Sequence, residues 1–227
     1  MFKRTLTQSD YFLIAANLLP VVGVWAWGWS PKEVFLVYCL ETIIIGIFNL
    51  VKMGVVTIVR KTDTWYNGPS RTKQSGLFFM LFFLLHYGLF VGVQMGIFFG
   101  VSGIGEGRHI NAFSFFYKWP QLISNDSLIM LGAFVFCYGF KVLVDFILSG
   151  EYKTIPMTLL LFQPYGRIFI QQITVILGSM FLSFGGGKIF ILVFALIKIF
   201  FEVFVNFNGI LNKAMKDMEK TSNKDNP

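Results

Sequence analysis

A carboxylate, Glu41, stands near the middle of a stretch from Tyr38 to Lys52 that is otherwise apolar enough to cross a bilayer. At about 100° per residue, Tyr38, Asn49 and Lys52 fall on the same narrow arc of a helix as Glu41. A charge at mid-membrane depth costs roughly 2.5–3.5 kcal/mol on the insertion scale, so Glu41 is expected to face protein or water. Because intramembrane ionisable groups are functional candidates by default, Glu41 is the first candidate site residue.

Other charged side chains inside the apolar segments also follow helical spacing. Lys141 and Asp145 lie four residues apart, so they share a helix face and can partly neutralise each other. Lys198 and Glu202 have the same spacing and are expected to behave as a coupled pair. Polar stripes on several helices predict a common polar interior. Its candidate members are Glu41, His86, Asn49, Gln171, Arg167, Lys198, Glu202, Lys141 and Asp145.

Glu41 and His86 are expected to meet inside the bundle. At 1.5 Å per residue, Glu41 lies about 12 Å below the outer end of its helix and His86 about 15 Å from the inner end of its own. These are similar levels in a hydrocarbon core about 30 Å thick. Neither has an oppositely charged neighbour within one turn, so each needs a partner on another helix. We predict direct or water-bridged contact in a cavity of the second, third, fifth and sixth helices, with Arg167 or Lys198 competing for Glu41.

Such a pair could act as acid and base, or as metal ligands, on a membrane-soluble substrate. The chain has 2 His and 2 Cys, and it lacks the His-Glu-x-x-His and paired-cysteine patterns, so a closed zinc site is not expected. No Gly-x-Ser-x-Gly motif points to a serine hydrolase. Metal and cofactor content stay open at this point.

Membrane-spanning helices must position these residues. The chain is 55% hydrophobic and 14% charged, whereas soluble domains are about 25% charged. The predicted fold class is all-α, a polytopic transmembrane helical bundle in a single domain over residues 1–227, with a charged cytoplasmic tail at 211–227. Six spans are expected, at about residues 10–29, 31–59, 76–101, 127–148, 164–184 and 188–210.

The distribution of Lys and Arg predicts the orientation of the bundle. With six spans, both termini and the loops after the second and fourth spans share one side. That side carries Lys3, Arg4, Arg60, Lys61, Arg71, Lys73, Lys153, Lys213, Lys216, Lys220 and Lys224. The other side carries Lys32, Arg108, Lys118 and Lys188. This eleven-to-four asymmetry predicts that both termini are cytoplasmic.

The partners expected from composition are the lipid bilayer and further copies of the chain. The net charge of +7 is spread over short loops, and no basic groove with spaced aromatic residues is present, so nucleic acid is not expected. Six spans without an evident repeat are few for a carrier, and homo-oligomer formation would help such a function.

Four groups of residues form short motifs in the second to sixth helices. They are Tyr38-x-x-Glu41 with Asn49 and Lys52, His86-Tyr87-Gly88-Leu89-Phe90, Pro164-Tyr165-Gly166-Arg167, and Lys198. These motifs resemble an uncharacterised family of bacterial polytopic integral-membrane proteins, a domain of unknown function. The resemblance implies a helical protein of the bacterial inner (plasma) membrane and no established activity. Relatives often carry further histidines where this chain has Gln94, Gln171 or Gln172, and Asn206, which puts a histidine-rich metal centre in doubt.

Three classes of function remain open on the sequence. Ionisable residues near the midplane favour transport, or the binding of a small ligand or ion, because many carriers bind substrates and coupling ions there. An intramembrane enzyme that uses Glu41 and His86 is the first alternative. The second is a non-catalytic assembly subunit, in which the polar stripes hold helices together at about 0.6 kcal/mol per hydrogen bond.

Overall fold

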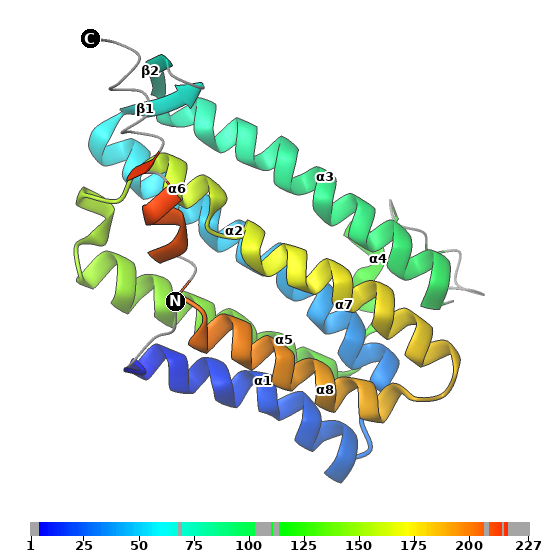
Figure 1. The fold of residues 1–227 in the computed structure, drawn as a ribbon. Coiled ribbons are helices and arrows are strands. Elements are labelled where there is room, and N and C mark those ends of the chain that lie inside the picture. Colours follow the sequence, from blue (N-terminus) through cyan, green and yellow to red (C-terminus); the bar gives the residue numbers. More distant parts are fainter. Residues whose placement is uncertain are drawn as a thin grey trace.

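The structure is a computed structural model that describes residues 5–67, 70–102, 110, 114–206, 209–214 and 216–217. Along these residues the chain is mostly helical, as predicted, and its long helices pack side by side in a bundle (Figure 1). The long helices are α1 (Gln8–Ala26), α2 (Pro31–Arg60), α3 (Gly76–Ser102), α5 (Asn125–Lys141), α7 (Tyr165–Ser183) and α8 (Gly187–Ile199).

Four helices of the described chain are long and apolar enough to cross a membrane. They are α1, α2, α3, and α5 together with its π-helical continuation η2 (Val142–Leu148). In the same bundle, α8 continues as a second π-helical segment, η4 (Phe200–Phe204). The helix ends there, short of the expected residue 210, and the Asn206 side chain accepts a hydrogen bond from the Gly209 backbone N–H at 2.9 Å. Such local side-chain bonds compete with helical pairing, which accounts for the earlier end.

The central helix of the bundle is α2, which contacts α1, α3, α5, α7 and α8. Every residue from Val34 to Thr42 is buried. A lipid-facing helix would bury only one stripe of its surface, so α2 is enclosed on all sides at this level. Glu41 therefore lies in the protein interior, as its charge requires.

A β-hairpin, absent from the predicted all-α class, follows α2. The strands β1 (Thr62–Asn67) and β2 (Ser70–Ser75) pair in antiparallel register from Thr62 opposite Ser75. The helix before them ends at Arg60, and Lys61 takes the left-handed φ of 62° that turns the chain. Asp63 anchors the hairpin, because its Oδ2 accepts the Met157 backbone N–H at 2.8 Å.

The chain breaks between two helices at Gln163 and Pro164. The short α6 (Met157–Phe162) is buried from Met157 to Leu161 and packs on α2 and α3. After the two-residue turn the chain continues as α7, on the same side of the bundle (Figure 1). Pro164 lacks an N–H and suits the start of a helix, so the break is built into the sequence.

The helices alternate in direction. Figure 1 shows the start of α1, the hairpin, α6 and the segment after η2 near one end of the bundle. The other end carries the α1–α2 connection, the α7–α8 turn and the short α4 (Phe115–Lys118), which is followed by η1 (Trp119–Leu122). We call the first of these the hairpin end.

Candidate functional site

The buried side of the site is a cluster of charges around Lys198. Its ammonium forms an ion pair with Glu41 Oε2 and lies 3.7 Å from Glu202 Oε1. It also donates to Asn17 Oδ1 at 2.8 Å, while the Tyr138 hydroxyl donates to Glu41 Oε1 at 2.6 Å. Exposure is 0% for Glu41, 3% for Lys198 and 7% for Glu202. Two carboxylates thus share one ammonium in the core of the bundle, and we call these three residues the Lys198 cluster.

Aromatic rings complete the surroundings of this ammonium. Lys198 Nζ lies 4.6 Å from the centroid of the Phe134 ring and 5.1 Å from that of the Tyr38 ring. Cation–π attraction of this kind contributes about 2 kcal/mol or more where the cation is desolvated. The rings therefore help to hold a charge that is largely removed from water.

The structure does not bring Glu41 and His86 together, which corrects the predicted shared cavity. His86 is exposed on α3, where its Nδ1 lies 2.5 Å from the Tyr165 hydroxyl. Its neighbour Tyr87 faces α2 instead and donates to the Thr42 carbonyl at 2.7 Å. One residue corresponds to about 100° of helix rotation, so only one of the two can point inward. Glu41 takes its partners from α5 and α8, and the acid–base or metal pair of Glu41 with His86 is not formed.

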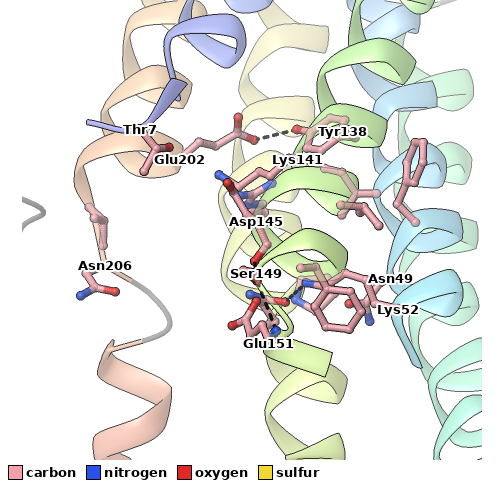
Figure 2. A pocket seen from close by; sticks show the side chains of 18 residues that line it. Thr7, Asn49, Lys52, Tyr138, Lys141, Asp145, Ser149, Glu151, Glu202 and Asn206 are labelled. Atoms are coloured by element: carbon pink, nitrogen blue, oxygen red, sulfur yellow. Dashed lines mark hydrogen bonds between the residues drawn. The ribbon is translucent and has the colours of Figure 1, made fainter. Parts of the chain in front are cut away.

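A pocket of about 520 Å³ lies beside the Lys198 cluster. It is lined from α2, α5, η2, α7 and η4 and from Thr7 just before α1 (Figure 2). Its charged lining residues are Lys52, Lys141, Arg167, Asp145, Glu151 and Glu202. Glu202 and Tyr138 belong to both the pocket lining and the contacts of the Lys198 cluster, so the pocket reaches the buried charges.

Lys141 and Asp145 each have a partner near the start of α1. Lys141 Nζ lies 3.4 Å from Asp10 Oδ1, and the Ser9 hydroxyl donates to Asp145 Oδ2 at 2.6 Å. The helix changes to π geometry at Val142, so residues four apart no longer stack as they do in an α-helix. The predicted pairing of Lys141 with Asp145 along one helix is thereby replaced by contacts to α1.

Lys52 and Arg167 face the pocket from α2 and α7. Lys52 Nζ donates to Gln163 Oε1 at 2.6 Å and lies 5.1 Å from the centroid of the Phe146 ring. The Arg167 guanidinium lies 5.7 Å from the centroid of the Tyr138 ring. Within the described residues, neither cation has a carboxylate within 4 Å, and the Arg167 guanidinium makes no hydrogen bond.

Glu151 lines the pocket from η3 (Glu151–Lys153), a 3-10 helix that follows η2. Burial raises the pKa of the Glu151 carboxyl, and the nearby charge of Lys52 opposes that rise. Figure 2 shows Glu151 close to Ser149, on the side of the pocket that also carries Asp145.

Asn49 and Gln171 bind backbone carbonyls. Asn49 Nδ2 donates to the Leu160 carbonyl at 3.0 Å and so connects α2 to α6. Gln171 Nε2 donates to the Tyr38 carbonyl and connects α7 to α2. These two bonds position helices around the site, although Asn49 also lines the pocket.

Sequence reasoning assigned no site role to the polar residues of α1. Asp10 is 0% exposed and Asn17 is 0% exposed, and both contact lysines of the site. They lie seven residues apart, on one helix face, and that spacing is the signal that identifies them. Tyr138, by contrast, lies three residues before Lys141, and this spacing in the sequence places both on one helix face.

In the described part of the chain, no group of three or more His, Cys, Asp and Glu side chains is arranged to hold a metal ion. Cys39 and Cys137 are buried free thiols.

Comparison with known proteins returns one finding. Searches of curated proteins and of solved structures give no match. A family model described as a family of unknown function, DUF6498, matches residues 1–225. Because the match covers nearly the whole chain, the protein belongs to the DUF6498 family, whose function is not known.

Proposed function

We propose that the chain is a six-span protein of the bacterial inner membrane with both termini in the cytoplasm. Four candidate spans and the alternation of helix directions support this topology, with α7 and α8–η4 as the fifth and sixth spans. In that arrangement the hairpin end is cytoplasmic, in agreement with its excess of Lys and Arg.

We further propose that the protein binds a small polar solute in the pocket beside the Lys198 cluster and carries it across the membrane. The observation that carries the proposal is a pocket of about 520 Å³ whose lining includes three basic and three acidic side chains, inside a bundle of apolar helices. Ligand pockets of proteins are typically about 300–1,000 Å³. Charges buried at this depth are expensive, and carriers place their substrate and ion sites at such positions.

Packing beyond the Lys198 cluster supports access from one side. Phe35 packs against Phe98 at 5.3 Å, Phe190 at 5.6 Å and Phe194 at 6.5 Å between ring centroids. Phe35 and its partners lie further from the hairpin end than Glu41 does. This aromatic packing supports closure of the pocket toward the opposite end, as a carrier requires in one of its two states.

Counterflow in proteoliposomes tests the proposal. Liposomes loaded with a polar solute at high concentration should transiently accumulate the labelled solute from outside when they contain the protein. Glu202→Gln should slow this uptake, because Glu202 joins the pocket to Lys198, while Asp126→Asn at the exposed start of α5 should leave it unchanged. If a panel of cationic, anionic, zwitterionic and neutral solutes gives no counterflow above empty liposomes, the protein is not a carrier of such solutes.

A further inference from the structure

Among the residues that the structure describes, four charged side chains of the pocket, two of each sign, have no ion-pair partner. They are Lys52, Arg167, Asp145 and Glu151. We infer that the pocket takes a zwitterionic ligand, a molecule that carries an ammonium group together with a carboxylate or phosphate. This inference rests on the proposed solute-binding function and names the class of solute.

The positive side of the pocket suits the anionic group of such a ligand. Arg167 lies in the first turn of α7, and its guanidinium has N–H donors that no described residue accepts. Pro164 and Arg167 both line the pocket, so the N-terminus of α7 borders it. A helix N-terminus carries about half a positive charge, and half-helices that start within a membrane bundle bind anionic substrate groups in this way. Lys52 adds a second cation, which is bonded only to the neutral amide of Gln163.

The negative side suits the ammonium group. Asp145 accepts a hydrogen bond from the neutral Ser9 hydroxyl, and no described cation lies within 4 Å of it. The Glu151 carboxylate has no hydrogen-bond or ion-pair partner in the described residues. Asp145 lies on η2 and Glu151 on η3, where the Glu151 carboxylate is near enough to Lys52 to feel its charge without forming an ion pair with it.

A ligand with a single charge would satisfy only half of this arrangement. An anion bound at Arg167 would leave Asp145 and Glu151 without an ion pair and would add one more negative charge to the pocket. A cation bound at Asp145 would likewise leave Arg167 and Lys52 without an anionic partner. Because an uncompensated charge in a low-dielectric site is strongly unfavourable, the structure favours a ligand that offers both signs at once.

Two sources offer this chemistry: a soluble zwitterion such as an amino acid, and the headgroup of a lipid such as phosphatidylethanolamine. Isothermal titration of the full chain in detergent separates ligand charge from ligand size if leucine is compared with 4-methylpentanoate and 3-methylbutylamine. These analogues are leucine without its ammonium and leucine without its carboxylate. A second set compares phosphoethanolamine with inorganic phosphate and with ethanolamine, and nanodiscs with and without phosphatidylethanolamine test the lipid.

In at least one set, we expect the zwitterion to bind at least about tenfold more tightly than either single-charge analogue, since about 1.4 kcal/mol corresponds to a factor of ten. The set in which this occurs identifies the source. If a single-charge analogue binds as tightly as its zwitterion, the inference is overturned, while binding itself leaves the proposed function standing. If no probe of any charge class binds and counterflow is also absent, both the zwitterion inference and the proposed transport function fail.

Substitutions assign the binding to this pocket. Arg167→Gln should weaken the zwitterion and the carboxylate or phosphate analogue, whereas Glu151→Gln should weaken the zwitterion and the amine. The Glu151 carboxylate has no partner among the described residues to lose, so Glu151→Gln should keep the fold if Arg167→Gln does not. The matched controls are Lys188→Gln and Asp126→Asn, both exposed at the far ends of α8 and α5. Equal loss of affinity in the controls would overturn the assignment.

Discussion

Replacing Lys198 by Met removes the ammonium that two buried carboxylates share. At 3.7 Å and an effective dielectric constant of about 20, its attraction to Glu202 alone is about 4.5 kcal/mol. Desolvation offsets part of such attraction, and breaking a buried pair typically costs about 3–5 kcal/mol, because a buried charge is left without its partner. We therefore expect Lys198→Met to lower the free energy of unfolding by about 3–5 kcal/mol.

Neutralising one of the two carboxylates in addition should recover part of the lost stability. Comparing Glu41→Gln with Glu202→Gln shows which carboxylate depends more on Lys198. Lys198 is closer to Glu41 than to Glu202, and Glu202 also borders the pocket. The double variant Lys198→Met/Glu41→Gln should therefore be more stable than Lys198→Met by about 1–3 kcal/mol, within the range of couplings between contacting residues. Lys198→Met/Glu202→Gln should recover less.

Thermal and denaturant-induced unfolding in detergent, followed by tryptophan fluorescence, measures these differences as a double-mutant cycle. Lys188→Met is the control, because it removes an exposed lysine from the start of the same helix and should change stability by less than about 0.5 kcal/mol. If neither double variant is more stable than Lys198→Met, the carboxylates do not depend on Lys198 and the description of the cluster is wrong.

Three further predictions concern packing, pH and topology. Gly46→Ala should destabilise the protein by about 1–3 kcal/mol, since the added Cβ would lie 2.6 Å from the Tyr87 ring, whereas Gly88→Ala, which meets nothing within 4 Å, should be neutral in the same unfolding assay. Burial raises the pKa of Glu151, so the stability that its protonated form gives at low pH is lost as the pH rises through that raised value. Glu151→Gln should therefore be more stable than the wild type at about pH 8 and equal to it at about pH 4, and a melting temperature that differs equally at both would contradict this. Lys73→Cys should be labelled by an impermeant thiol reagent only from the cytoplasmic side, and labelling from outside would reverse the topology.

The sequence predicts best where a boundary signal or a helical spacing is strong. Pro31 at a helix start and the basic residues from Arg60 onward bound α2 to within one residue of its observed limits. The four-residue spacing of Lys198 and Glu202 places them on one face, where they lie 3.7 Å apart. Both inferences depend only on local geometry, which the sequence contains.

The sequence fails where the answer depends on the rotation of a helix or on a change of helix type. Apolar residues surround α3 on every side, so no stripe distinguishes the His86 face from the Tyr87 face, and the wrong one was expected inside. The π-helical turn after Lys141 shifts Asp145 away from Lys141, its expected partner, and no pattern of residues predicts that turn. The β-hairpin between Thr62 and Ser75 lies in a polar segment whose turn signal indicates a reversal of the chain without showing that strands flank it.

The most direct test of a hydrated pocket inside the bundle compares two adjacent residues of η2. Val142 lines the pocket, whereas Leu143 is 48% exposed on the outer surface, which faces lipid in the proposed topology. Cysteine reacts as the thiolate, which forms in water and not in hydrocarbon. A charged, membrane-impermeant thiol reagent applied from the cytoplasmic side should therefore modify Val142→Cys rapidly and Leu143→Cys slowly, and a zwitterion that binds should protect Val142→Cys. Faster modification of Leu143→Cys, or no modification of Val142→Cys, would contradict a polar pocket open to the cytoplasm.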